Sequence, residues 1–323
     1  MNRKLLIRLI GVLLCFYGFA FAQEPMYPTK PITIVVGYAP GGSTDTVARL
    51  IGQEITNAMG RPVIVENRPG ASQNIAAEYV ARAPKDGYTL FMAAASVTVN
   101  ISIYSKLNYD PVKDFAQVEI MGTVPHLLVV HPSFPATSIE ELIAYIKKNP
   151  GKLNYASAGI GTSPHLSGEL FKKMINVDVT HMPFKGAAPA VTGVATGEAH
   201  FLFTTIGSAW GMLQAGKVKA LGITSAQRSP QMPEIRTMIE GGLPGFVTLA
   251  WDGLLAPAGT PGNVISALNS VIVNAKKRED FSARLDKLGY NRIAGTPEDF
   301  RNFFLAEIER WRKVAKEGKI TAE

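Results

Sequence analysis

The chain of 323 residues is long enough for two domains, and 46% of its residues are hydrophobic, so each domain can bury a core of its own. The formal net charge is +7 at pH 7, but no run of Lys and Arg resembles a nucleic-acid-binding patch, so we expect no nucleic-acid partner. A mild positive charge favours small anionic ligands instead.

The N-terminus has the features of a secretory signal. Basic residues at the start precede an apolar run over Leu9–Phe19, and Ala20-Phe21-Ala22 fits the small-x-small cleavage pattern. The run is too short for a typical membrane span, so we expect residues 1–22 to be cleaved after Ala22, with an uncleaved anchor as the alternative. Cleavage removes Cys15, the one cysteine, and lowers the net charge to +4. The mature protein then has neither a disulfide nor a thiol nucleophile.

Beyond the signal, short β-rich runs alternate with helical stretches. This alternation is typical of α/β proteins with mostly parallel sheets that helices cover on both faces. The runs that read as strands are Ile32–Val36, Val63–Glu66, Tyr88–Ala93, Leu127–Val130, Leu153–Ser157, Val177–Met182, Phe201–Thr204 and Ala220–Thr224.

The stretches between the strands carry helix start signals. Ser138-Ile139-Glu140-Glu141 is a capping box ahead of an apolar pattern. Ser163-Pro164, Thr260-Pro261 and Thr296-Pro297 place a hydroxyl before a proline, which is typical of a helix start. Apolar residues at helical spacing over Phe300–Trp311 then predict a buried helix face.

Two sets of strand–helix units, followed by helices alone, predict two lobes. We expect the chain to cross between them near Thr123–His131 and to return near Val247–Pro257. This gives one lobe of residues 23–124 and 250–323 and a second lobe of residues 125–249. In open α/β sheets ligands bind beyond the carboxyl ends of the strands, so two facing lobes would surround a single cleft with such loops.

The loop after the first predicted strand, Gly37–Asp45, is rich in glycine and leads into a helix. Such a turn leaves backbone N–H groups unpaired at the positive end of a helix dipole, which suits a carboxylate or another anion. It lacks the spacing of a P-loop or a dinucleotide-binding turn. The alternative is that the glycines only make a tight turn. Asp45 reads as a first-turn residue stabilised by the helix dipole.

Further loops repeat this character at Glu66–Asn74, Ser157–His165 and Pro183–Pro189. Each supplies backbone N–H groups or hydroxyls at a predicted helix start. Several such loops, shared between the two lobes, favour anion binding by helix termini. Lys185 is a partner for a ligand carboxylate, a solvated side chain or a member of a structural ion pair.

Motifs for catalysis and metal binding are weak. No nucleophile elbow, H-E-x-x-H motif or His/Asp/Glu cluster at metal-ligand spacing occurs, so we expect no enzymatic activity, no metal and no cofactor. Ser163 and His165 lie together at a helix start, which leaves a secreted Ser/His hydrolase as a remote alternative. No acid is placed to orient the imidazole, and a structural role for His165 is favoured.

Taken together and in this order, the loops resemble those of the Bug family, the TctC-like periplasmic solute-binding receptors of tripartite tricarboxylate transporters. The resemblance extends over nearly the whole mature chain. The matching stretches are Tyr27–Ile32, Pro40–Asp45, Val65–Ala71, Asp86–Leu90, Tyr109–Phe115, Gly161–Leu166, Pro183–Gly186 and Gly253–Pro261.

The resemblance implies a two-lobed periplasmic binding protein of the Venus flytrap type. Its partners would be a dicarboxylate, tricarboxylate or aromatic carboxylate and the membrane subunits of a transporter, with the receptor itself a monomer. A ligand-sensing partner of a membrane signalling protein is the alternative with the same fold. The residues expected to bind the ligand are Tyr38, Gly41, Gly42, Ser43, Thr44 and Ser96 of the first lobe and Gly161, Thr162, Ser163, Phe184, Lys185 and Gly186 of the second.

Departures from the family pattern bear on specificity. The chain has Ser72-Gln73-Asn74 where the family usually has further glycines, and Ile101 where it commonly has proline. Phe184 replaces a common tyrosine and predicts a less polar distal pocket for an aromatic or long-chain carboxylate. His200 stands where aspartate is common. Asp252 stands where an uncharged residue is common and, if it faces the cleft, would favour a ligand amine.

Overall fold

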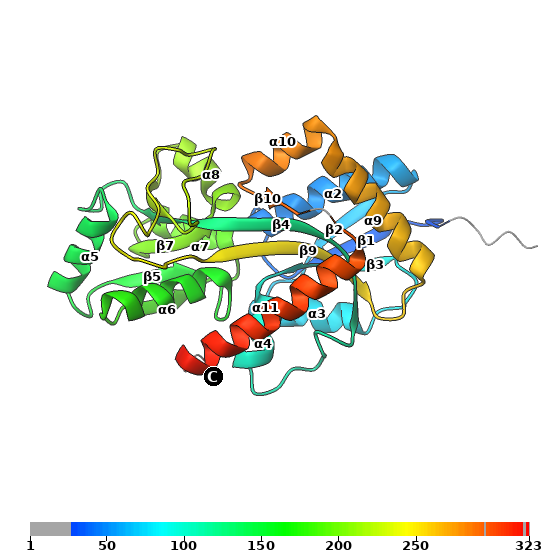
Figure 1. The fold of residues 1–323 in the computed structure, drawn as a ribbon, viewed down its shortest axis with the longest axis horizontal. Coiled ribbons are helices and arrows are strands. Elements are labelled where there is room, and N and C mark those ends of the chain that lie inside the picture. The colour runs from blue at the N-terminus through cyan, green and yellow to red at the C-terminus, as the bar shows by residue number, and fades with distance from the viewer. Residues whose placement is uncertain (1–26, 294, 319–320, 323) are drawn as a thin grey trace, which may run out of the picture.

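The computed structural model describes residues 27–293, 295–318 and 321–322. Two α/β lobes lie next to each other, and two long strands, β4 (Phe115–Val130) and β9 (Leu249–Pro257), run between them (Figure 1). The predicted signal at residues 1–22 lies outside the described residues. Within the described ranges, no helix has both the length and the apolar composition needed to cross a membrane.

The first lobe contains the segments before β4 and after β9. In its sheet, β1 lies between β2 and β3 and is parallel to both. The elements before β4 are β1 (Ile32–Val36), α2 (Ser43–Met59), β2 (Val63–Asn67), η1 (Ala71–Gln73), α3 (Asn74–Ala81), β3 (Thr89–Ala94) and α4 (Ser96–Ile103). Those after β9 are α9 (Gly262–Lys277), α10 (Glu279–Lys287), β10 (Asn291–Arg292) and α11 (Pro297–Gly318).

The second lobe is built from the chain between the two long strands. In its sheet, β5 lies between β6 and β7 and is parallel to both, and β4 adds antiparallel beside β7 and β8. Its elements are α5 (Ile139–Lys148), β5 (Asn154–Ser157), α6 (Ser163–Ile175), β6 (Thr180–Pro183), α7 (Ala187–Ala195), β7 (Phe201–Thr205), α8 (Ile206–Gln214) and β8 (Lys219–Ile223).

The predicted two-lobed α/β architecture is confirmed, but the sheets are mixed rather than mostly parallel. The strand–helix repeats of each lobe pair in parallel, whereas β4 and β9 pair antiparallel with each other and with strands beside them. β4 also begins at Phe115, well before the predicted Leu127. Its register with β9 shifts twice, the second time beside Gly122, and such bulges break the alternation that marks a strand in a sequence.

Each lobe buries apolar side chains on both faces of its sheet. Successive residues of a strand point to opposite faces. On β4, Leu127 and Val129 accordingly pack with α7 and α8, while Leu128 and Val130 pack with α5 and α6. The first lobe is built likewise, with α2, α9 and α10 on one face and α3 and α11 on the other.

The helix start signals are largely confirmed. The Ser138 hydroxyl accepts a hydrogen bond from the Glu141 N–H at the start of α5, 3.1 Å away. α11 begins at the predicted proline and fully buries Phe300 and Phe304. α6 begins one residue earlier than expected, at Ser163, so the preceding threonine is its N-cap.

The two lobes touch across the cleft between them. The Ala39 N–H donates to the Lys185 carbonyl at 3.1 Å, and the Ser72 hydroxyl donates to the Ile160 carbonyl. Leu166 of α6 also packs into an apolar cluster with α4 and α11 of the first lobe. The described conformation is therefore closed.

Candidate functional site

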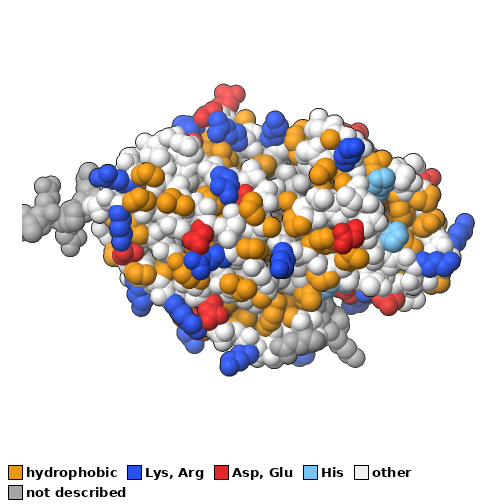
Figure 2. Space-filling view, turned by 180° about the vertical axis from the view of Figure 1, so that it is seen from behind, with side chains coloured by type: hydrophobic (Ala, Val, Ile, Leu, Met, Phe, Trp, Pro, Cys, Tyr) orange, Lys and Arg blue, Asp and Glu red, His pale blue; other side chains and the backbone are white. Residues whose placement is uncertain are grey.

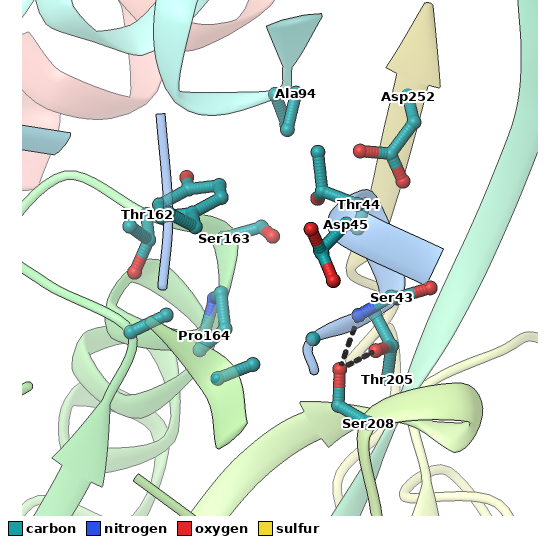
Figure 3. Close-up of a pocket in the computed structure, with 16 residues that line it drawn as sticks. Ser43, Thr44, Asp45, Ala94, Thr162, Ser163, Pro164, Thr205, Ser208 and Asp252 are labelled. Atoms are coloured by element: carbon teal, nitrogen blue, oxygen red, sulfur yellow. Dashed lines mark hydrogen bonds between the residues drawn. The ribbon is translucent and has the colours of Figure 1, made fainter. Parts of the chain in front are cut away.

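A cavity of about 40 Å³, called the inner cavity below, lies between the lobes where β1, β3, β5 and β7 end (Figure 3). This is the edge at which α/β sheets usually bind ligands. The inner cavity is lined by Tyr38, Gly42, Ser43, Thr44, Asp45, Ala94, Ala95, Ala158, Thr162, Ser163, Pro164, Ala187, Thr205, Ser208, Ala250 and Asp252.

The predicted glycine-rich turn links β1 to α2 and forms one wall of the inner cavity. Gly41 has φ +88°, a backbone conformation that favours glycine. Its N–H donates to Asp45 Oδ2 at 3.0 Å. The Ser43 N–H donates to Ser208 Oγ of α8 at 2.9 Å (Figure 3). Two amides expected to bind an anion are thus engaged within the protein, while the side chains of Ser43 and Thr44 remain on the cavity wall.

Asp45 holds this turn in place, beyond the dipole role predicted for it. Its Oδ1 accepts from Arg49 Nη2 at 2.9 Å and from Asn67 Nδ2 at 2.9 Å. Burial raises the pKa of Asp45, but the hydrogen bonds from Arg49, Gly41 and Asn67 lower it more, so the net pKa lies below its usual value. The carboxylate is therefore ionised and fully used inside the lobe.

The second lobe contributes the turn between β5 and α6. Thr162, the N-cap residue, is 1% exposed, and its hydroxyl donates to the Gly159 carbonyl at 2.6 Å. The Gly161 N–H donates to His165 Nδ1 at 3.2 Å. His165 therefore has the structural role favoured from the sequence, and burial lowers its pKa to about 4.

Ser163 has a histidine partner that the sequence analysis missed. His126 Nε2 lies 3.0 Å from Ser163 Oγ, and both side chains are buried. Burial lowers the pKa of His126 to about 3, despite an opposing contribution from the Thr248 backbone. The residue lies on β4 where the chain was expected to cross between lobes, which was the only signal for its place near the cleft.

A third helix start, that of α8, was also missed. Thr205 Oγ1 lies 2.8 Å from Ser208 Oγ, which in turn accepts from the first lobe (Figure 3). A signal was present, because the predicted strand at Phe201–Thr204 is followed by Thr205-Ile206-Gly207-Ser208, the same strand–turn–helix pattern as in the other loops.

A second, more open pocket of about 230 Å³, the outer pocket, adjoins the inner cavity. The two share Tyr38 and Ala158, so Tyr38 forms the expected wall. Phe184 and Lys185 line the outer pocket only. The full lining is Gly37, Tyr38, Gly70, Ala71, Ser72, Tyr104, Ala158, Gly159, Ile160, Pro183, Phe184 and Lys185.

Some of the predicted binding residues lie behind these surfaces. Gly41, Ser96, Gly161 and Gly186 line neither pocket. Ser96 is 1% exposed, and its hydroxyl lies 3.0 Å from the Tyr38 hydroxyl, so it supports the wall from behind. A side chain at Gly186 would lie 3.1 Å from the backbone of the other lobe, so glycine there permits closure.

The residues that depart from the family pattern lie at different distances from the inner cavity. Ala71, Ser72 and Gln73 all have positive φ, the conformation for which glycine is best suited. His200 bonds to Asn154 at the start of β5, at the end of the strand remote from the inner cavity. Asp252, by contrast, lines the inner cavity and is 2% exposed.

Known proteins are similar to this chain over nearly its whole length. Residues 47–320 match the sequence model of TctC, the tripartite tricarboxylate transporter family receptor. The chain belongs to the TctC family. The resemblance to Bug proteins is thereby confirmed, and members of this family are solute-binding receptors.

Individual relatives of this TctC-family protein agree. BugT of Bordetella pertussis is 32% identical, with 98% of each chain covered. Rpa4515 of R. palustris, solved with adipate, is 37% identical with a TM-score of 0.89 over 91% of this chain and 99% of that one. MatC of Rhodopseudomonas palustris, solved with malate, is 36% identical with a TM-score of 0.83 over 89% and 99%.

The surface of the TctC-family protein has a mixed character. On the face shown in Figure 2, Lys and Arg side chains are interspersed with acidic and apolar ones. Among the described residues, the exposed large apolar side chains are Ile64, Ile75 and Tyr79, and the guanidinium of Arg68 lies over the Tyr79 ring, 3.6 Å from its centroid. Among the described residues, no group of three or more His, Cys, Asp or Glu side chains is arranged to hold a metal ion.

Proposed function

We propose that this protein captures a small organic carboxylate in the periplasm and delivers it to the membrane subunits of a tripartite transporter. One observation carries the proposal. Both lobes present a helix start to the same cavity, α2 with Ser43 and Thr44 and α6 with Thr162 and Ser163. Helix starts attract anions through the dipole and through N–H groups that lack partners within the helix.

The ligands of relatives support a carboxylate. Adipate and malate, found with Rpa4515 and MatC, are both dicarboxylates. At about 40 Å³ the inner cavity has room for little more than one carboxylate group. We infer that the rest of the ligand extends past Tyr38 toward Phe184 and Lys185 in the outer pocket, and that Phe184 makes that end less polar.

The contacts also suggest an affinity. Hydrogen bonds to a charged group contribute about 1.5–3 kcal/mol each. Three or four of them, less the entropy of immobilising ligand and lobes, predict a Kd on the order of 1 μM, about −8 kcal/mol. Because the Gly41 and Ser43 amides are engaged within the protein, we assign these bonds chiefly to the hydroxyls of Ser43, Thr44 and Ser163.

Release and capture require the lobes to separate. We propose that they divide at residues 124/125 and 249/250, within β4 and at the start of β9, and that the protein acts as a monomer. A ligand shifts the equilibrium toward closure only if it binds the closed form better, which requires contacts to both lobes. The Ala39–Lys185 and Ser43–Ser208 bonds already favour the closed form.

We propose that the protein is exported and cleaved after Ala22. The mass of the mature protein purified from the periplasm would test the cleavage site.

We also propose that the protein is not an enzyme. Ser163 pairs with His126, whose lowered pKa makes it a poor base, and among the described residues no carboxylate bonds to that imidazole.

Thermal unfolding of the mature protein against aliphatic, amino and aromatic mono- to tricarboxylates tests the proposal. A ligand that binds only the folded form, at 100 times its Kd, adds about 2.7 kcal/mol and raises the midpoint clearly. A flat response with no co-purified ligand by native mass spectrometry would refute carboxylate binding.

Two variants test whether both lobes take part. Thr44→Val and Ser163→Ala each remove one hydroxyl from opposite walls and should weaken binding about tenfold, the value of one hydrogen bond to a charged ligand. Thr180→Val makes the matched change at an exposed position on β6 and should leave the Kd unaltered. An unchanged Kd in both site variants would exclude these helix starts as the site.

A further inference from the structure

Asp252 is a buried carboxyl group on the wall of the inner cavity. On β9 its neighbours across the sheet are Ala94 of β3 and Gly122 of β4. Figure 3 shows its carboxyl group pointing toward Thr44 at the start of α2. Any ligand group held by that helix turn therefore lies next to Asp252.

Only one of its two carboxyl oxygens has a partner among the described residues. Oδ2 accepts a hydrogen bond from the Tyr290 hydroxyl, whereas Oδ1 is buried and no group in the described ranges donates to it. A buried acceptor without a donor costs about 1–3 kcal/mol, and more when it is charged. Oδ1 is thus the part of Asp252 that is left for a ligand.

Neighbouring groups do not neutralise a charge at this position. The titratable groups around the inner cavity are Tyr38, Asp45, His126 and Tyr290. Burial keeps both tyrosines protonated by raising their pKa and keeps the histidine neutral by lowering its pKa to about 3. The carboxylate at position 45 is already paired with Arg49. Among the described residues, no Lys or Arg lines this cavity.

The pKa of Asp252 reflects these surroundings. Burial raises it to about 6, against smaller lowering contributions from the Tyr290 hydroxyl, which donates to Oδ2, and from the nearby Thr44 hydroxyl. An ionised ligand carboxylate at the α2 turn would repel an ionised Asp252. Two unit charges 4 Å apart at an effective dielectric constant of 20 interact with about 4 kcal/mol. One proton shared between facing carboxyl groups removes this repulsion and supplies a hydrogen-bond donor.

We propose that Asp252 is a ligand-binding residue that takes up one proton from solvent when a carboxylate binds and donates it from Oδ1 to the ligand in a hydrogen bond. The inference rests on the proposed function, because it requires a carboxylate at this site. No covalent bond other than the new O–H is made or broken.

This proton uptake sets the pH dependence of binding. With a pKa of about 6 in the free protein, Asp252 is roughly 97% ionised at pH 7.5, so binding takes up close to one proton. Affinity then changes little just below pH 6, as long as the ligand's own carboxyl groups stay ionised, and falls about tenfold for each pH unit above 6.

Isothermal titration calorimetry of the mature protein tests the proposal, with adipate, malate, citrate and benzoate as probes. Titrations at a single pH in phosphate and in Tris, whose ionisation enthalpies differ, give the number of protons taken up per ligand bound. At about pH 7.5 we expect nearly one proton, and the Kd should weaken about tenfold between pH 7 and pH 8.

Two variants sharpen the measurement. Asp252→Asn keeps an N–H donor near the position of Oδ1 but cannot titrate, so we expect no proton uptake and the same Kd at pH 7 and pH 8. Asp178→Asn removes the same charge from a side chain that is 95% exposed and should retain the wild-type proton count. The wild-type count itself decides the question if the Asp252 variant does not fold.

Binding of a probe with less than about 0.2 proton taken up and no pH dependence would overturn the inference and leave the proposed function intact. Tighter binding of aspartate than of succinate, lost in Asp252→Asn, would also overturn it, because Asp252 would then be ionised and bound to an ammonium group. No binding of any probe between about pH 5.5 and 8 would remove the proposed function, and this inference with it.

Discussion

The helix starts on the two sides of the inner cavity are held by groups of different charge. On α2 the ionised carboxylate of Asp45 accepts from the Gly41 N–H, and on α6 the neutral ring of His165 accepts from the Gly161 N–H. Hydrogen bonds lower the pKa of the carboxylate, and burial lowers that of the histidine. A lowered pKa keeps a carboxylate charged and an imidazole uncharged. A charged acceptor therefore fixes the glycine turn before α2, and an uncharged acceptor fixes the one before α6.

Asp252 does not follow this pattern. It lies on the first-lobe side, yet burial raises its pKa to about 6 instead of lowering it. Acid therefore relieves a cost at Asp252, while it imposes a cost at the buried histidines of the second lobe. Asp45 thus increases the stability of the folded protein, whereas an ionised Asp252 decreases it. Such a loss of stability is common at binding residues.

Removing the charged support of α2 should have the largest effect. Asp45→Ala leaves the Gly41 N–H without its acceptor and removes one of the two acceptors of the Asn67 amide, and we expect a loss of about 3 kcal/mol in the free energy of unfolding in urea at pH 7. Arg49→Gln keeps those two bonds and removes a half-exposed ion pair and an exposed hydrogen bond to the Asn67 side-chain oxygen, so its loss should stay below about 1 kcal/mol. Equal losses in the two variants would contradict this role of Asp45.

Asp252→Asn should stabilise the ligand-free protein. Because the pKa is raised in the folded state, the ionised group opposes folding above pH 6, and this cost disappears as the pH falls toward the unfolded pKa near 4. At pH 8 the variant should gain about 3 kcal/mol over the wild type, and at pH 4.5 the difference should fall to about 1 kcal/mol. A pH-independent difference in urea unfolding would argue against an ionised Asp252.

The second lobe should lose stability in acid. His126 is neutral in the folded protein, whereas the unfolded chain binds a proton below about pH 6.5. Its contribution is full above that pH and falls by about 1.4 kcal/mol per pH unit below it, or about 2 kcal/mol by pH 5.

Urea unfolding from pH 7 to pH 5 measures this loss most clearly in the Asp252→Asn background, where the opposing titration is absent. His126→Gln should reduce the slope by about one proton. An unchanged slope would show that His126 is not the group responsible.

The smallest effect is expected at the strained turn that follows β2 in the first lobe. Ala71 has φ +44° and an exposed side chain, so Ala71→Gly removes backbone strain at the loss of one methyl group. We expect a gain of about 0.5–1 kcal/mol in unfolding free energy, after the extra entropy of the unfolded glycine is subtracted. A loss of stability would indicate that the methyl group packs against the outer pocket wall.

Much of the fold was predictable because its signals are local. The glycine-rich turn before Ser43, the cap at Ser138 and the apolar stripe from Phe300 depend on residues a few positions apart, and all were found. Only the last four residues of β4 were predicted, because bulges near Gly122 and a proline at position 125 interrupt its alternation.

The site was predictable only in part, because its contacts join distant segments. Ser43 and Ser208 are 165 positions apart, and His126 and Ser163 are 37 positions apart, so no local pattern reports either pair. Asp252 was noticed as a departure from the family, but its burial and its unpaired oxygen could not be read from neighbouring residues. Ser96 has the polar side chain of a binding residue, yet it faces Gln73 and Tyr38 instead of the cavity.

The sequence by itself determined the two-lobed α/β plan, the helix starts that face the cleft and the resemblance to carboxylate receptors, since hydrophobic period, glycine turns and caps act over a few residues. Only the tertiary structure decided which hydrogen-bond donors at these helix starts remain available to a ligand. Closure of the lobes engages the Ser43 amide with Ser208 and leaves Asp252 buried in a cavity that no Lys or Arg of the described ranges lines. Hydrogen-bond satisfaction and desolvation depend on every group within a few ångströms, and those groups come from all parts of the chain.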